Sequence, residues 1–90
     1  MKYKENLILN EILEYIKSTY SEHYSSNGFQ LQDAFSELGI QEQFAQASAL
    51  KYLYRYGKKQ GKNKTDLYKA VHYICMLLSP TVSKNGRAVK

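Results

Sequence analysis

The sequence contains little cysteine, proline or tryptophan: its 90 residues include one cysteine, one proline and no tryptophan. The single cysteine, Cys75, excludes an internal disulfide framework and a cysteine-rich zinc site. No apolar run approaches the roughly 20 residues needed to cross a bilayer. The first residues also lack the apolar core of a secretory signal. The sequence therefore predicts a cytoplasmic protein of one small domain with no membrane partner.

Charge and tyrosine are the unusual features of the composition. Residues 1–50 contain three lysines and seven acids, a net charge of −4, whereas residues 51–90 contain eight lysines, two arginines and one acid, a net charge of +9. This asymmetry indicates either an anionic ligand or head-to-tail self-association. The nine tyrosines offer faces for stacking and hydroxyls for hydrogen bonds, although tyrosine is also common at protein interfaces.

The hydrophobic periodicity predicts an all-α fold, a compact bundle of three to four helices. We expect one domain over residues 1–79 and a disordered basic tail over 80–90. The first helix is expected from about Glu5 to Ser18, followed by a polar loop to Phe29. A short helix over 31–38 would end at Gly39 in a left-handed C-cap. Because so small a bundle buries little surface, we expect a homo-oligomer.

Two longer helices follow in the second half of the chain. One is expected from about Gln41 to Tyr56, ended by Gly57, and the next would begin at the N-cap Thr65. The apolar stripes predicted to face inward are Ile8, Leu9, Ile12, Leu13 and Ile16 in the first helix, Ile40, Phe44, Ala47, Leu50, Leu53 and Tyr54 in the third, and Leu67, Ala70, Val71, Ile74 and Leu78 in the fourth.

The basic residues around the third helix are candidates for binding phosphate. Lys51, Arg55 and Lys58 fall at i, i+4 and i+7, on one edge of the predicted inward face. They suit a phosphate, since arginine offers a fork and lysine a point charge. They could equally extend past the core and pair with acids of the N-terminal half. The lysine-rich loop at 57–64 lacks Walker spacing, so it is either an anion-attracting or a merely solvated turn.

Other candidates lie on the third and fourth helices. Tyr52 and Tyr56 share the face of the third helix opposite its predicted core, where they could stack on bases or form an oligomer interface. On the fourth helix Asp66, Lys69 and Tyr73 align at i, i+3 and i+7. Asp66 could orient a lysine or accept a hydrogen bond from a sugar or base, or it could simply pair with Lys69.

The histidines and the cysteine predict no metal centre. Neither His23 nor His72 has another potential metal ligand at the sequence spacing that a zinc fold requires. His23 lies beside Tyr24 in a polar segment and could contact a ligand, whereas His72 is expected on an exposed arc of its helix. Cys75 has no adjacent base to activate it and is expected to be a packing residue. We find no catalytic arrangement, and we expect no bound cofactor.

Four short segments together resemble a known family. They are His23-Tyr24, the run from Gln41 to Phe44, the run from Ala49 to Lys59 and the run from Asp66 to Tyr73. Their order and spacing resemble the SaV-like family of phage early proteins. This resemblance implies a nucleotide-handling protein, because the family includes a nucleotide kinase of a T-odd coliphage that works as a large oligomer without a Walker motif. Phage proteins of this size also include anti-CBASS sponges, which bind cyclic dinucleotide alarm signals without cleaving them.

Two functions follow from the residues and the resemblance together. The first is a phage-encoded sponge that sequesters a cyclic dinucleotide immune signal in the host cytoplasm. The second is a nucleotide kinase or phosphotransferase, since phosphoryl transfer needs mainly positioning and positive charge. Nonspecific nucleic-acid binding fits the charge but not the tyrosine pattern. The predicted ligand-binding residues are His23, Tyr24, Lys51, Tyr52, Arg55, Lys58, Asp66, Lys69 and Tyr73.

Overall fold

The structure is a computed structural model in which residues 1–23 and 37–83 are described, with the side chains of residues 21–23 left outside that description. It consists of helix α1 (Glu5–His23), helix α3 (Gln41–Arg55), helix α4 (Lys64–Leu78) and a short 3-10 helix, η1 (Ser79–Thr81). The described residues contain no β-strand. The prediction of an all-α fold is confirmed. None of the described helices is long and apolar enough to cross a membrane.

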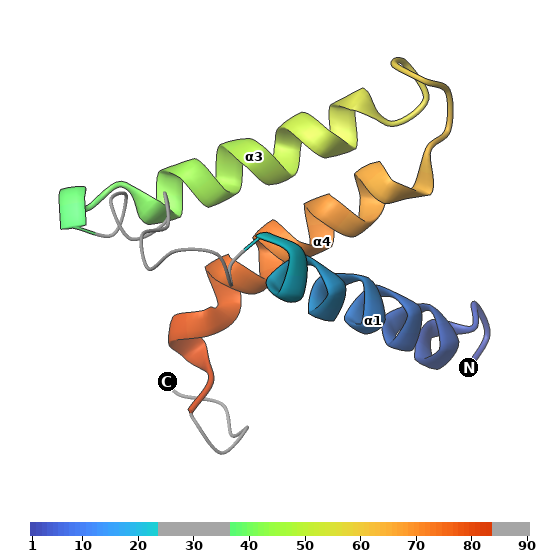
Figure 1. The fold of residues 1–90 in the computed structure, drawn as a ribbon, viewed down its shortest axis with the longest axis horizontal. Coiled ribbons are helices and arrows are strands. Elements are labelled where there is room, and N and C mark those ends of the chain that lie inside the picture. The colour runs from blue at the N-terminus through green and yellow to red at the C-terminus, as the bar shows by residue number, and fades with distance from the viewer. Residues whose placement is uncertain (24–36, 84–90) are drawn as a thin grey trace.

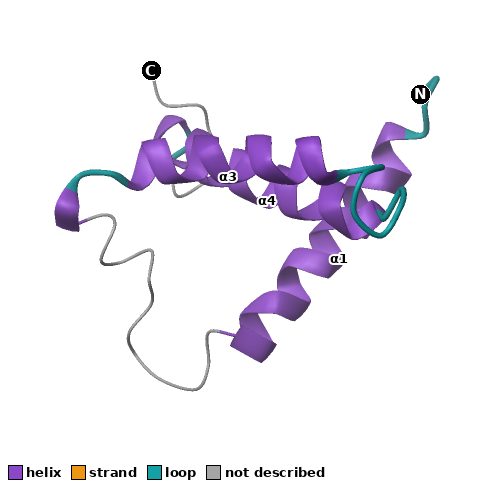
Figure 2. Ribbon diagram, turned by 90° about the horizontal axis from the view of Figure 1, so that it is seen from above, coloured by secondary structure: helices purple, strands orange, loops and turns teal. Residues whose placement is uncertain are grey.

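Helices α3 and α4 form an antiparallel hairpin, and α1 crosses α4 on the side away from α3 (Figure 1). Seen from above, α1 diverges from the two aligned helices (Figure 2). Helix α4 therefore contacts both of the others, and any site between the helices must be built around it.

The turn between α3 and α4 is fixed by backbone bonds. Helix α3 ends at Arg55, and Gly57 follows with φ of 85°, a conformation that glycine adopts without strain. The Gly57 amide donates a hydrogen bond of 2.9 Å to the Gly61 carbonyl. Helix α4 is capped by Asn63, whose side chain accepts from the Thr65 amide. The prediction that Thr65 is the N-cap was wrong by two residues, because asparagine caps at least as well as threonine.

Helix α1 is longer than predicted. It continues past Ser18 to His23 instead of giving way to a loop. The hydroxyls of Ser18 and Thr19 donate to the carbonyls of Tyr15 and Ile16, at 2.6 and 2.7 Å. Polar side chains that bond back to the preceding turn are accommodated within a helix, so local polarity did not mark its end.

The inward face predicted for α3 was wrong. The residues that α3 buries are Ala45, Ser48 and Ala49, whereas Leu50 is 60% exposed and Tyr54 is 72% exposed. Small side chains let the backbones of α3 and α4 approach closely, so the face in contact is not the most apolar one. Phe44 is half-buried, and the other predicted inward residues, Ile40, Ala47 and Leu53, are exposed.

The core of the described residues is small. Its buried apolar residues are Ile12, Ala45, Ala49 and Ala70. In α1 the predicted stripe is buried only at Ile12, with Ile16 half-buried and Ile8, Leu9 and Leu13 exposed. In α4, Leu67 and Val71 are half-buried, whereas Ile74 and Leu78 are exposed. Cys75 is also exposed, so its assignment as a packing residue was wrong. The hydrophobic periodicity indicated helices with an apolar stripe, but it did not indicate how many residues of each stripe a single chain buries.

Two predicted segments lie largely outside the described residues. Of the predicted short helix over 31–38, only Glu37 and Leu38 are described, and both are helical. Gly39 follows with φ of 75°, which confirms the glycine-terminated end. In the predicted tail, η1 includes Pro80 and Thr81, and residues 84–90 lie outside the described part.

Candidate functional site

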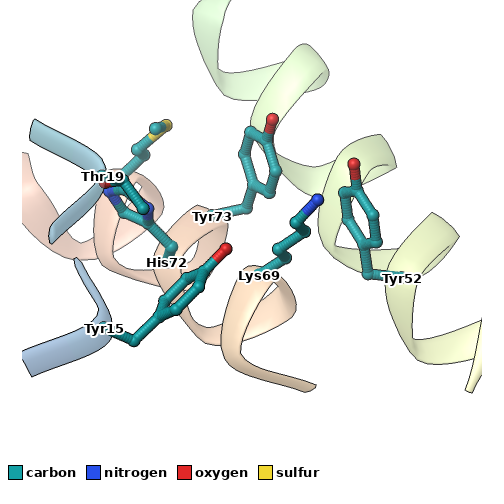
Figure 3. Close-up of a pocket in the computed structure, with 7 residues that line it drawn as sticks. Tyr15, Thr19, Tyr52, Lys69, His72 and Tyr73 are labelled. Carbon is teal, nitrogen blue, oxygen red and sulfur yellow. The ribbon is translucent and has the colours of Figure 1, made fainter. Parts of the chain in front are cut away.

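A pocket of about 200 Å³ lies on α4 at the point where α1 and α3 both approach it. Helix α4 contributes the largest number of lining residues, α1 contributes two and α3 contributes one (Figure 3). The lining residues are Tyr15, Thr19, Tyr52, Lys69, His72, Tyr73 and Met76. Three aromatic rings, one ammonium group and one imidazole therefore face a shared space.

The aromatic residues on the α3 side form an ordered stack. The rings of Tyr52 and Tyr73 are nearly parallel, with an interplanar angle of 9° and centroids 5.9 Å apart. Phe44 meets Tyr73 edge-on at 5.6 Å, which supports that ring from the α3 side. On the other wall, Tyr15 packs against Tyr68 at 5.3 Å. The pocket therefore presents flat apolar faces held by neighbouring rings, as a planar ligand requires.

Two lysines lie over the ring of Tyr52. The Nζ atoms of Lys51 and Lys69 are 4.7 and 5.2 Å from the centroid of that ring. Cations within about 6 Å of an aromatic centroid are attracted to its face. Lys69 lines the pocket itself, and its amino group points toward Tyr52 in Figure 3. The helices thus place positive charge next to the stacked rings.

Arg55 and Asp66 form an ion pair across the hairpin. Arg55 Nε lies 3.6 Å from Asp66 Oδ1, with side chains that are 33% and 7% exposed respectively. Asp66 Oδ2 and Arg55 Nε are buried and have no hydrogen-bond partner. Asp66 therefore pairs with Arg55 and not with Lys69, which was the alternative considered from the sequence. Asp66 is a buried carboxylate that holds the Arg55 guanidinium at the edge of the hairpin.

Among the described residues, Lys58 and Lys64 do not line the pocket. Lys58 lies beyond the end of α3, and its Nζ stands 4.3 Å from the ring centroid of the exposed Tyr54. Lys64 pairs with Glu11 of α1 at 2.9 Å, which joins the acidic and basic halves of the chain. Each of the three residues on the predicted basic edge (Lys51, Arg55 and Lys58) therefore contacts a different partner.

His72 is part of the pocket, contrary to the expectation that it lies on an exposed arc. It is half-buried, and its ring lies 5.9 Å from that of Tyr20 and 6.5 Å from that of Tyr73. Desolvation by burial lowers the pKa of His72 below its ordinary value of 6.5. At pH 7 the ring is therefore neutral and offers one donor and one acceptor nitrogen.

Two predicted site residues are not placed. His23 is the last residue of α1, but its side chain lies outside the described residues, as does the whole of Tyr24. The described part of the chain has no group of three or more histidine, cysteine, aspartate or glutamate residues that could hold a metal ion.

Four pocket residues were missed by the sequence analysis: Tyr15, Thr19, His72 and Met76. Tyr15 and Thr19 share a helical face with Ile12, since the intervals are three and four residues. A search for polar or aromatic residues that continue a buried stripe would have found them. His72 and Met76 are likewise four residues apart on α4. Tyr52, Lys69 and Tyr73 were predicted and do line the pocket.

Comparison with known families gives one assignment. A family model described as "Protein of unknown function (DUF3310)" matches residues 3–75. Because the match covers most of the 90 residues, the chain belongs to this family. No curated protein and no solved structure matches the chain.

Proposed function

We propose that this protein binds a nucleotide in the pocket on α4. The observation that carries the proposal is the stacked pair of Tyr52 and Tyr73 with the ammonium groups of Lys51 and Lys69 beside it. A nucleotide presents the same two elements, a flat base and an anionic phosphate, next to each other. Base stacking on an aromatic residue contributes about 1–3 kcal/mol, and a hydrogen bond to a charged group about 1.5–3 kcal/mol.

The size of the pocket limits how much of a ligand one subunit can hold. Its volume of about 200 Å³ is below the roughly 300–1,000 Å³ of pockets that enclose drug-sized ligands. It suits one base or nucleoside. The rings of Tyr52 and Tyr73 are already in stacking contact, so a base binds against an outer face or separates them. A cyclic dinucleotide would then require the pockets of two subunits.

The proposal includes a biological role that rests on the resemblance to phage early proteins. The protein would act in the host cytoplasm as an anti-CBASS sponge, holding a cyclic dinucleotide signal without cleaving it. It would do so as a homo-oligomer, which agrees with the need for two pockets per cyclic dinucleotide. Arg55 would contact a phosphate from the position in which Asp66 holds it.

The kinase hypothesis makes a different demand on the same residues. Phosphoryl transfer needs a group that accepts or orients a proton as well as positive charge. Asp66 is the predicted site carboxylate, but it is buried and paired with Arg55. A substrate would reach it only after that pair had opened. We therefore keep sequestration as the proposal and turnover as the outcome that would replace it.

The test is a ligand-recovery assay with cyclic dinucleotides and nucleoside monophosphates, with and without magnesium. Free nucleotide is measured by chromatography before and after the protein is denatured by heat. We expect one nucleotide to disappear and to return intact. Recovery in a phosphorylated or cleaved form would show an enzyme, and no depletion of any nucleotide would remove the proposal.

A pair of lysine variants locates the binding. Lys69→Gln removes the pocket ammonium group and should weaken binding at least tenfold, because a charged hydrogen bond contributes about 1.5–3 kcal/mol. Lys62→Gln removes the same charge from the exposed α3–α4 turn and is the matched control. Equal losses in the two variants would indicate attraction by net charge alone and would contradict a site at Lys69.

A further inference from the structure

One side of α3 carries two tyrosines with two cations between them, a surface that we call the α3 flank (Lys51, Tyr52, Tyr54 and Arg55). Successive residues of a helix are turned by about 100°. Measured around the axis from Tyr52, Arg55 therefore lies at about 60° and Lys51 at about 100° in the same direction, and Tyr54 follows at about 160°. All four residues lie within the last turns of α3, so the rings and the cations form one compact surface.

The flank extends the pocket outward to a second aromatic ring. Tyr52, at one end, lines the pocket (Figure 3). Tyr54, at the other end, is 72% exposed, and the Nζ atom of Lys58 stands 4.3 Å from its ring centroid. Between them, Arg55 keeps 33% of its side chain exposed while its Nε faces Asp66. Each end of the flank therefore pairs a tyrosine ring with a lysine.

The charges of the flank favour an anionic ligand. The only acid of α3 is Glu42, nine positions before Lys51, so it is turned about 180° away from that lysine. Asp66 of α4 is buried and pairs with Arg55, so it presents little charge to solvent. Exposed cations without an acid on the same side of the helix create a positive potential that attracts phosphate.

We propose that the α3 flank binds single-stranded nucleic acid. One base occupies the pocket beside Tyr52, the neighbouring base stacks on Tyr54, and the phosphate that joins them lies between, at Lys51 and Arg55. The inference rests on the proposed nucleotide pocket, since that pocket holds one of the two bases. It adds a ligand class, a linear strand whose second nucleotide lies outside the pocket.

The positions of the two rings favour a single strand over a duplex. Tyr52 and Tyr54 lie on nearly opposite sides of a helix that is about 10–12 Å across with its side chains. Two neighbouring bases that reach both rings must be splayed apart, as unpaired bases are when they stack on aromatic side chains. The bases of a duplex are stacked on one another and paired, so they do not reach both rings.

The lysines that lie over the rings leave room for stacking. Lys51 and Lys69 stand over Tyr52, and Lys58 stands over Tyr54. A cation over an exposed ring is weakly held, whereas stacking of a base on the same ring is stronger. A base therefore displaces the ammonium group from the ring, and the ammonium group then meets a phosphate of the strand. Lys58 supplies this contact for the nucleotide at Tyr54.

The test compares an eight-nucleotide DNA strand that contains all four bases with the four deoxynucleoside monophosphates, by isothermal titration calorimetry. The strand should bind about tenfold or more tightly than any mononucleotide, because it occupies both rings. An RNA strand of the same sequence is measured beside it, and preference for either strand over the mononucleotides supports the inference.

A pair of tyrosine variants locates the second base. Tyr54→Ala should weaken strand binding by about fivefold or more and leave mononucleotide binding unchanged. Tyr3→Ala is the matched control, since Tyr3 is 67% exposed and has the Nζ atom of Lys2 5.5 Å from its ring centroid, but lies outside the flank. It should change neither affinity. Equal losses in the two variants, or a duplex of the same sequence that binds as tightly as the strand, would overturn the inference.

The failure of this inference is distinguishable from the failure of the proposed function. Mononucleotide binding without any preference for the strand would remove the inference and leave the proposed function in place. Depletion of no nucleotide in the ligand-recovery assay would remove both.

Salt dependence gives an independent result. The logarithm of the affinity for a single strand falls against the logarithm of the salt concentration with a slope of about 0.7 for each phosphate contact. Lys58→Gln should reduce the slope by about that amount, and Lys2→Gln should leave it unchanged. An unchanged slope in Lys58→Gln, or equal reductions in both variants, would contradict phosphate contacts at this surface.

Discussion

The burial of the two long faces of α3 is the reverse of what their composition suggests. The face against α4 is built from Ala45, Ser48 and Ala49 and is buried. The face turned outward includes Leu50 and Tyr54 and is largely exposed. In a chain that packs alone the larger apolar residues would be inside. The difference teaches that the contact between α3 and α4 selects small side chains, while larger apolar side chains of α3 stay on the surface of the chain.

The largest effect should come from enlarging a residue on the inner face. Ala45 is 1% exposed, so Ala45→Leu has no space and should lower the free energy of unfolding by up to about 3 kcal/mol. Gln46→Leu adds the same side chain at an exposed neighbouring position and should change stability by less than about 0.5 kcal/mol. Urea denaturation of both variants measures the difference. Similar losses would show that the inner face is not closely packed.

The ion pair at the end of the inner face should have the next largest effect. Arg55→Met keeps the apolar stem but leaves the Asp66 carboxylate buried without its cation. We expect a loss of about 2 kcal/mol, reduced from the cost in a fully buried pair because Arg55 is partly exposed. Adding Asp66→Asn should recover part of that loss, and denaturation of both single variants and the double variant tests it. Additive losses would mean that the two residues do not interact.

This expectation changes how an Arg55 variant is interpreted in a binding assay. Loss of nucleotide binding in such a variant could come from the uncompensated Asp66 rather than from a missing phosphate contact. The stability of each variant therefore has to be measured beside its affinity.

The smallest effect concerns pH and the pocket on the inner side of the hairpin. The pKa of His72 is lowered in the folded protein, so the unfolded chain binds more protons as the pH falls through 6.5. Stability should therefore decrease with falling pH from just above 6.5 down through the lowered pKa, below which this contribution no longer changes. His72→Gln should flatten this part of a melting-temperature profile. An unchanged profile would show that His72 is not desolvated.

The sequence predicted the helices better than their faces. The interval from Gln41 to Tyr56 is nearly that of α3, and Gly57 and Gly39 both have the positive φ expected of helix-ending glycines. These features are local, because periodicity and turn residues act through neighbours in the chain. The face of α3 was wrong because hydrophobic periodicity ranks side chains by apolarity. Ala45 and Ala49 are weak in that ranking, although small size is what their contact with α4 requires.

The candidate site was predicted in part for the same reason. Tyr52, Lys69 and Tyr73 carry the aromatic and basic character that sequence patterns reveal, and all three line the pocket. Tyr15 and Thr19 belong to α1, whose approach to α4 depends on tertiary packing between residues more than 40 positions apart. The spacing from Ile12 places both residues on one helical face, but no local pattern specifies that this face meets α4. Arg55 and Asp66 were predicted separately, and only the hairpin shows that they form a pair.

The turn at 57–61 has a consequence for the order in which the molecule assembles. Helices α3 and α4 are joined by eight residues, 56–63, so their contacts close a short loop, and short loops form quickly. Helix α1 meets α4 only across a long stretch of chain and is the slower element to dock. Two of its residues, Tyr15 and Thr19, complete the pocket. We therefore expect the hairpin to fold first and the pocket to be the last feature to form and the first to open.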